Sequence, residues 1–301
     1  MPLKKLILSL PDTLMKYLLP GLAALSLLAC STNETPKEVV AEPAAYTSLL
    51  TDAEKLTYTT VRLTTDTSLL SDEDKRMIPI LIQAGEIMND LFWQESFGVR
   101  DTLLAGCKDE QLLQYVHANY GPWDRLNNNT SFIAEYGEKP AGAQFYPLDM
   151  TKEEFEAWND PFKTSLYTMV RRDSTGALTS VFYHEYFAEE VSKVASLLRE
   201  AATITSNASF KFYLEERAKA LETDRYNASD IAWLQLKDNS IDVVIGPIEN
   251  YEDHLFGYKA AHECYILVKD QAWSQRLERY SALLPGLQQE LPCDPKYKKD
   301  P

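Results

Sequence analysis

Apolar residues recur at helical spacing between residues 77 and 91, and this pattern predicts a long amphipathic helix. Ser71 precedes the pattern and Asp74 follows it by three residues, which is the spacing of a capping box at a helix start. Pro79 falls near that start, where a missing backbone N–H is tolerated best. We expect the apolar face of this helix to pack against the core. The residues on that face are Met77, Leu81, Ala84, Met88 and Leu91.

The rest of the chain mixes helical and strand patterns. Thr151 and Glu154 repeat the capping-box spacing, and Phe155 and Trp158 behind them are expected to face inward. The turn sequence Asp-Ser-Thr-Gly separates two short strand patterns, which predicts a β-hairpin. Helices are also predicted over 189–204, 208–224 and 271–287, and strands over 166–172, 177–183, 241–248 and 263–270.

The order of these elements predicts the fold class. Strands and helices do not alternate regularly, which argues against a doubly wound parallel sheet. We predict an α+β fold that is mainly helical, with a modest and mostly antiparallel sheet.

The first 29 residues have the composition of an export signal. Lys4, Lys5 and Lys16 precede a short apolar run, and the run ends in Leu-Leu-Ala followed by Cys30. A cysteine directly after the cleavage point matches the bacterial lipobox. We therefore expect Cys30 to be lipidated, so that the lipid holds the protein on the bacterial cell envelope, at the outer membrane, without spanning it.

Residues 30–45 are polar and contain proline, which indicates a flexible tether between the lipid and the folded part. The remaining residues, 46–301, are enough for one large or two small domains.

The formal net charge of the chain is −15, and no basic stripe is present. This charge argues against a nucleic-acid partner. Cys107, Cys264 and Cys293 are widely spaced and do not indicate a particular disulfide, so buried free thiols are the preferred interpretation. The sequence leaves the oligomeric state open.

The histidines do not form a zinc motif. A helical zinc site needs two histidines about one turn apart, so that both rings reach one ion. The chain contains His117, His184, His254 and His262, and none of them has a second histidine at that spacing. We interpret His184 as a polar residue where a strand passes into a helix. In the strand pattern around His262, that side chain and Glu263 should point to opposite faces.

The segment after the strand at 241–248 is the best candidate for chemistry. If the strand continues, Glu249, Tyr251 and Asp253 share one face at a spacing of two residues. A carboxylate there can bind an ammonium group, and a phenol can donate a hydrogen bond to a developing oxyanion. The same pattern is also typical of a solvated strand end.

The same segment resembles a known family. Gly246, Ile248, Glu249, Tyr251 and Asp253 follow the Gly-x-Ile-Glu-x-Tyr-x-Asp motif of the dipeptidyl peptidase III family of zinc metallopeptidases, in its bacterial lipoprotein branch. Residues 90–98, 120–129 and 143–158 are similar to that branch as well, so the resemblance covers nearly everything after residue 46.

The resemblance implies a two-lobed peptidase that binds short peptides in the cleft between its lobes and releases dipeptides from their N-termini. It implies that Glu249 helps to hold the amino group of the peptide. It also implies that Tyr251 lies against the scissile carbonyl and stabilises the tetrahedral intermediate, and that Asp253 has a supporting structural role.

The sequence departs from the family at the metal. The family's His-Glu-x-x-(x)-His motif lies downstream of the segment matched here, and it carries the general base as well as zinc ligands. Residues 46–301 are therefore expected to form the substrate-binding lobe and part of its partner, as an incomplete copy that holds no zinc and is inactive alone. The alternatives are a lipid-anchored, non-catalytic protein that binds peptides or acts as a scaffold, and a structural envelope protein without a ligand.

Overall fold

The computed structural model describes residues 44–51, 58–59 and 61–298. The chain divides into two units, Met1–Glu42 and Pro43–Pro301, and the description below concerns the second unit alone. The export signal, Cys30 and most of the tether lie outside the described residues, so the predictions about them stay predictions. Among the helices that are described, none combines the length and the apolar character needed to span a membrane.

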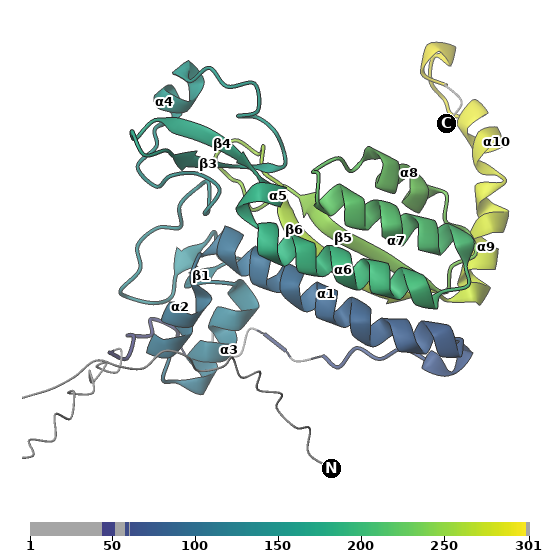
Figure 1. Cartoon of the computed structure of the whole chain (residues 1–301), viewed down its shortest axis with the longest axis horizontal. Coiled ribbons are helices and arrows are strands. Elements are labelled where there is room, and N and C mark those ends of the chain that lie inside the picture. The colour runs from purple at the N-terminus through teal and green to yellow at the C-terminus, as the bar shows by residue number, and fades with distance from the viewer. Residues whose placement is uncertain (1–43, 52–57, 60, 299–301) are drawn as a thin grey trace, which may run out of the picture. The chain divides into compact units, whose positions relative to one another are not determined.

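The described residues form α-helices joined by short strands and turns (Figure 1). The strands make three two-stranded antiparallel sheets, so the predicted α+β class with predominating helices is confirmed. The helices are α1 (Asp72–Ser96), α2 (Arg100–Gly106), α3 (Glu110–Asn119), α4 (Lys152–Ala157), α5 (Tyr183–Tyr186), α6 (Ala188–Ile204), α7 (Ala208–Leu221), α8 (Asn227–Leu234), α9 (Gln271–Ser281) and α10 (Leu284–Gln289). The strands are β1 (Trp123–Asp124), β2 (Thr130–Ser131), β3 (Thr168–Arg172), β4 (Leu178–Phe182), β5 (Ile241–Glu249) and β6 (Ala261–Val268).

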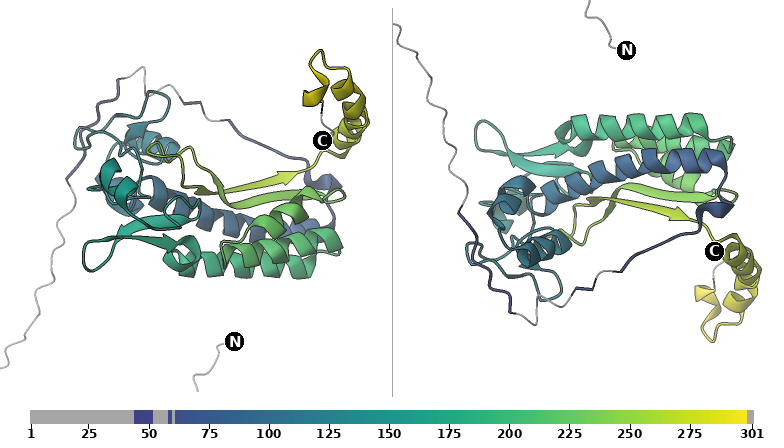
Figure 2. Two further views of the ribbon diagram at one scale, coloured as in Figure 1. Left: turned by 90° about the horizontal axis from the view of Figure 1, so that it is seen from above. Right: turned by 90° about the horizontal axis from the view of Figure 1, so that it is seen from below.

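The long helix α1 is the centre of the core. Its predicted apolar face is buried, from Met77 to Leu91, and the capping box of Ser71 and Asp74 is formed. Helix α1 packs against α6 and against β6, while α7 covers α6 and α8 follows α7. Figure 2 shows the β5–β6 hairpin lying along these helices, with α1, α6 and α7 running beside one another.

The β5–β6 hairpin has a register that explains the position of its proline. Pro247 lies opposite His262, and the backbone N–H of His262 donates to a side chain of α1, away from β5. Pro247 and His262 are therefore a pair without mutual backbone hydrogen bonds, so the missing N–H of proline breaks no bond between the strands. The edge of β5 that does not pair with β6 faces α7. There the Tyr213 hydroxyl donates to the carbonyl oxygen of Val243 at 2.5 Å.

Several local predictions need correction. Thr151 caps α4, but the carboxylate of Glu154 pairs with Arg172 instead of completing the capping box. The predicted helix over 271–287 is two helices, because Pro285 begins a new one in the first turn of α10. Helices α2, α3 and α8 were not predicted.

The cysteines and one histidine can also be compared with their predictions. All three described cysteines are free thiols, and Cys107 is buried as expected, but Cys264 is half-buried and Cys293 is exposed. His184 is the second residue of α5, which follows β4 directly, so it lies where a strand passes into a helix, as predicted.

A buried lysine ties the loop before β3 to the start of β6. Lys259 is fully buried, and its ammonium group donates to the carbonyl oxygens of Lys163 and Ser165 and to the hydroxyl of Thr168, at 2.8–3.0 Å. No carboxylate is hydrogen-bonded to this ammonium among the described residues. Burial therefore dominates and lowers the pKa of Lys259 to about 8, although the nearby charges of Asp253 and Asp160 oppose that shift.

The lowered pKa of Lys259 predicts how the stability of the protein depends on pH. The folded chain releases this proton near pH 8, whereas the unfolded chain keeps it until the ordinary lysine pKa of about 10.4. Between these values the unfolded state binds more protons, so the contribution of Lys259 to the free energy of unfolding rises with pH. We expect the difference in this free energy between the unaltered chain and Lys259→Met to increase by about 1–3 kcal/mol from pH 7 to pH 10. Urea unfolding of both proteins at the two pH values measures it, and a difference that stays constant would contradict the prediction.

Candidate functional site

The predicted continuation of the strand through Asp253 is wrong. Strand β5 ends at Glu249, and the following residues form a turn. The side chain of Tyr251 is exposed, with 76% of its surface accessible, whereas Asp253 is buried. Tyr251 and Asp253 therefore do not share a face with each other.

Glu249 reaches the open face of the hairpin through an irregularity in the register. Pairing shifts between Pro247 and Glu249, so that Glu249 lies opposite Ala261. In a regular ladder the side chain of Glu249 would point to the other face, because one residue of shift exchanges the two faces. The shift places Glu249 on the same face of the hairpin as Glu263 and Tyr265.

These three side chains make the open face acidic. The Tyr265 hydroxyl donates to the carboxylate of Glu263 at 2.8 Å. Burial raises the pKa of Glu263, the hydrogen bond from Tyr265 opposes this rise, and the charge of Glu249 adds to it. The same hydrogen bond, together with burial and the charge of Glu249, raises the pKa of Tyr265 to about 12. The mutual repulsion of the two carboxylates is relieved by any cation that comes between them.

Asp253 holds the turn from inside. Its carboxylate accepts the hydroxyl of Tyr146 at 2.7 Å and four backbone N–H groups at 2.8–3.2 Å. Charge-assisted bonds of this kind fix the path of the backbone, because each donor has one direction in which to point. The backbone donors belong to Leu255, Phe256, Tyr258 and Lys259.

Glu252 holds the same turn from the other side. It is buried, and its carboxylate accepts two hydrogen bonds from the guanidinium of Arg125, at 2.6 and 3.1 Å, and one from the ammonium of Lys139. Burial favours the neutral carboxyl, but the charges and hydrogen bonds of Arg125 and Lys139 outweigh it, so the pKa of Glu252 lies below its ordinary value. Tyr251 is thus an exposed residue next to two anchored carboxylates.

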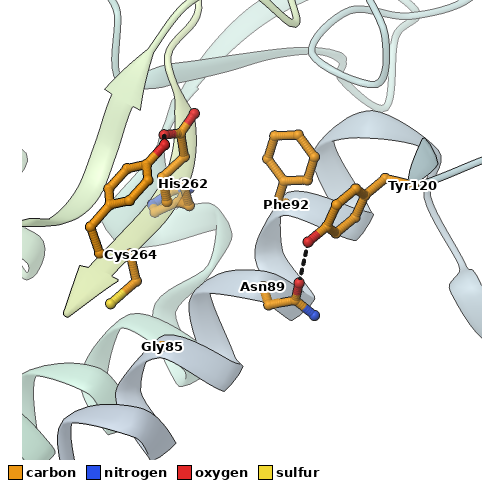
Figure 3. Close-up of a pocket in the computed structure, with 8 residues that line it drawn as sticks. Gly85, Asn89, Phe92, Tyr120, His262 and Cys264 are labelled. Atoms are coloured by element: carbon orange, nitrogen blue, oxygen red, sulfur yellow. Dashed lines mark hydrogen bonds between the residues drawn. The ribbon is translucent and has the colours of Figure 1, made fainter. Parts of the chain in front are cut away.

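A pocket of about 310 Å³ lies between α1 and the strand β6 (Figure 3). The hydroxyl of Tyr120 donates to the side-chain oxygen of Asn89 at 2.7 Å on one side of it. Arg125, which binds Glu252, also lies over the rings of Phe92 and Tyr120, at 5.4 and 5.9 Å from their centres. The pocket wall and the turn that carries Tyr251 are therefore held by the same guanidinium group. The lining residues are Gly85, Asn89, Phe92, Tyr120, His262, Glu263, Cys264 and Tyr265.

A buried pair joins β6 to α1 beneath this pocket. The carboxylate of Glu95 accepts the backbone N–H of His262 at 2.7 Å and lies 2.6 Å from its ring Nδ1. The ring of His262 packs against those of Tyr183 and Phe187, and its Nε2 has no hydrogen-bond partner among the described residues. His262 is buried and Glu263 is half-buried, so the prediction that they point to opposite faces is confirmed.

Comparisons with known proteins decide the family. A family model described as "Peptidase family M49" matches residues 138–301, more than half of the chain. The chain belongs to peptidase family M49. This finding confirms the resemblance to dipeptidyl peptidase III that the motif around Glu249 indicated.

Solved structures of the same family are similar to this chain. Dipeptidyl peptidase III from Caldithrix abyssi is 37% identical with a TM-score of 0.73, and the match covers 78% of this chain and 47% of that one. The enzyme from Corallococcus sp. strain EGB is 36% identical with a TM-score of 0.72, with 78% and 46% covered. Nudix hydrolase 3 from Arabidopsis thaliana is 29% identical over 303 residues, which is 80% of this chain and 39% of that protein. The chain spans less than half the length of each of these relatives.

M49 is a family of zinc metallopeptidases, but the histidines of this chain do not fit a zinc site. His262 is bound to Glu95 inside the core, and ring Nδ1 of His184 lies 2.7 Å from the carboxylate of Asp224. Among the residues with described positions, no three His, Cys, Asp or Glu side chains converge in a way that could hold a metal ion. No chemical step through zinc is therefore derived from the described residues.

Sequence reasoning proposed Glu249, Tyr251 and Asp253 as candidate site residues, and their roles stay predictions; it missed the residues that hold the turn around them. Glu252 was passed over because its partners, Arg125 and Lys139, lie more than 100 residues away in the chain. Glu263 was considered only as part of a zinc motif. The alternation of β6 already placed it on one face with Tyr265, which was the available signal.

The anchored turn predicts two different outcomes for neighbouring glutamates. Glu252→Ala removes a buried carboxylate that pairs with the half-buried guanidinium of Arg125 and the nearly buried ammonium of Lys139, and we expect it to lower the free energy of unfolding by about 3–5 kcal/mol. Glu249→Ala removes an exposed carboxylate from the same segment, and we expect a change within about 0.5 kcal/mol. Urea unfolding of both variants measures the contrast. Equal losses in the two variants would show that the turn does not depend on the Glu252 cluster.

Proposed function

We propose that this chain forms the peptide-binding wall of a zinc-dependent exopeptidase that releases dipeptides from peptide N-termini. Membership of peptidase family M49 supports the reaction class. The observation that carries the proposal is the register shift before Glu249, which puts its carboxylate on an open face two residues from the exposed Tyr251, with no partner among the described residues.

Glu249 binds the free amino group of the peptide in this proposal. Its carboxylate is exposed and accepts charge-assisted hydrogen bonds from an ammonium group. Glu263 lies on the same face and adds negative charge, which favours the ammonium form further. The preference for a free N-terminus follows, because a blocked N-terminus has no charge to neutralise these carboxylates.

Tyr251 donates a hydrogen bond to the carbonyl oxygen of the scissile bond. The donor is useful only if it stays in place while negative charge develops on that oxygen. The turn supplies this rigidity, since Glu252 and Asp253, the two residues that follow the exposed phenol, are both buried and bonded. Asp253 therefore acts through the backbone and not on the peptide.

The 301-residue chain alone neither holds catalytic zinc nor cleaves peptides in this proposal. Support comes from the spacing of its four histidines, none of which has a second histidine one helical turn away. Zinc in this family supplies a polarised water and a Lewis acid, and the part of the chain that the structure describes contains no cluster of three such ligands. The same wall without zinc suits the alternative function, which is capture of peptides by a non-catalytic protein.

Zinc content and dipeptide release of the purified chain test the inactivity. We expect less than about one zinc per ten chains after dialysis and no release of a dipeptide chromophore above the solvent blank, because a structural or catalytic zinc needs three or four protein ligands. Stoichiometric zinc or clear turnover would overturn the proposal that the chain is inactive alone. Binding of free-N-terminal peptides with no turnover, lost in Glu249→Gln, would support the peptide-binding role.

Substitution of Tyr251 tests its role in turnover, in a protein that carries this chain together with the rest of the family fold. We expect Tyr251→Phe to lower kcat by about 10²–10³-fold with a smaller change in KM, because an oxyanion donor acts mainly in the transition state. Tyr280→Phe, which alters another exposed tyrosine, on α9, is the matched control and should leave both constants unchanged. An unchanged kcat in Tyr251→Phe would remove this residue from catalysis.

A further inference from the structure

A second pocket, of about 360 Å³, lies on the other side of the hairpin, between the free edge of β5 and the helices α7 and α8. Aromatic side chains form much of its wall, and one arginine lies among them. The residues that matter here are Tyr167, Tyr213, Arg217, Tyr226 and Asp230. None of them belongs to the proposed peptide site around Glu249 and Tyr251.

Arg217 is buried to an unusual degree, and one of its donors has no acceptor among the described residues. Only 5% of its surface is accessible, yet its guanidinium makes one ion pair, from Nη2 to the carboxylate of Asp230 at 2.6 Å. Its Nε is buried with no hydrogen-bond partner among the described residues. A guanidinium has five N–H donors, and a buried donor without an acceptor costs free energy.

Tyr226 adds a second unused donor beside the first. Its side chain is 4% exposed, and its hydroxyl has no partner in the described part of the chain. The guanidinium carbon of Arg217 lies 5.4 Å from the centre of the Tyr226 ring, so the two groups are neighbours. Burial holds the pKa of Tyr226 well above its ordinary value, so the hydroxyl keeps its proton.

The backbone above these groups leaves them room. A Cβ on Gly246 would lie 3.4 Å from a ring carbon of Tyr226 and 3.8 Å from Nη1 of Arg217, and the positive φ of Gly246 is unfavourable for other residues. The glycine of the family motif thus allows the donors to lie directly under β5.

The chemistry missing from this pocket is an acceptor. An ionised carboxylate accepts hydrogen bonds and donates none, and its planar shape suits the guanidinium fork. The molecule already contains an arginine shared by two carboxylates, because Arg172 binds both Asp149 and Glu154 at 2.8–2.9 Å. The tyrosine walls in turn favour a flat apolar group behind the carboxylate.

We propose that this pocket binds a carboxylate carried on a flat apolar frame, with Arg217 and Tyr226 as its donors. Two sources share this chemistry, a small free acid and an acidic side chain of a peptide. The proposal does not depend on the proposed peptidase function.

An ordered water is the competing occupant. The Oδ1 atom of Asp224 is also buried without a partner, and its charge acts on Tyr226, so one water could join these groups. If only a water occupied the pocket, an acid and its neutral amide would bind with equal affinity, so a comparison of the two affinities distinguishes the two occupants.

Binding of phenylacetate and of its neutral analogue phenylacetamide to the full 301-residue chain tests the proposal by ligand-observed NMR. We expect phenylacetate to bind at least about tenfold more tightly, since only the acid pairs with the guanidinium. A parallel pair, the N-acetyl amides of glutamate and glutamine, tells whether a peptide side chain is accepted. Equal affinities for acid and amide, or no binding of either acid at 10 mM (a limit of about 3 kcal/mol), would overturn the proposal in favour of water.

Two variants make the test specific to the unused donors. Tyr226→Phe removes a hydroxyl that bonds to no described residue, so we expect an unchanged or higher melting temperature together with about fivefold or greater weakening of phenylacetate binding. Asp230→Asn removes the competing carboxylate from Arg217, so we expect tighter binding of phenylacetate by a few-fold. Tyr120→Phe, on the opposite side of the hairpin, is the matched control and should leave binding unchanged. Unaltered binding in Tyr226→Phe would exclude its hydroxyl as a ligand donor and overturn the proposed donor pair.

Discussion

The two adjacent carboxylates Glu252 and Asp253 determine where the rest of the candidate site lies. Both are buried, and both are charged groups that must be compensated away from water. Glu252 reaches Arg125 and Lys139, whereas Asp253 reaches Tyr146 and the backbone of its own turn. A short turn held by two such groups has little conformational freedom. The backbone of Tyr251, next to them, is therefore fixed, although its side chain is exposed.

The hairpin below the turn has the same kind of constraint. The N–H of His262 is held by Glu95 on α1, which fixes the direction in which β6 presents its backbone. Because the backbone of His262 is directed away from β5, the missing N–H of Pro247 costs no hydrogen bond between the strands. The shift before Glu249 is then the only irregularity in the described pairing of the two strands. One shifted residue then decides whether Glu249 faces the solvent-open side with Glu263 or the side of the core. The acidic face is therefore a result of register, and register is set by a buried pair more than 160 residues apart in the chain.

Local patterns in the sequence predicted the elements that depend on local physics. The buried face of α1, its capping box and the β3–β4 hairpin follow from spacing within a few residues, and they are formed as expected. The extension of β5 through Asp253 was wrong because alternation alone does not show where a strand ends, and the carboxylate of Asp253 turns inward to bind four backbone N–H groups of the turn. The partners of Glu252 were beyond reach for a different reason, since the contacts join segments far apart in the chain. The family motif indicated Glu249 and Tyr251 as candidates without explaining how either is positioned.

The buried cationic side chains of this acidic chain differ in whether the protein supplies acceptors for all of their donors. Lys259 and Lys139 are buried, but the ammonium of Lys259 has three acceptors and that of Lys139 has the carboxylate of Glu252, so each is explained by what it holds together. Arg217 is also buried, and its Nε has no protein acceptor among the described residues. Folding tolerates such a group only if the surrounding packing compensates for it, because an unpaired buried donor lowers the stability of the folded state. This contrast supports the proposal that Nε of Arg217 and the hydroxyl of Tyr226 take an acceptor from a ligand, whereas Lys259 and Lys139 already have protein acceptors.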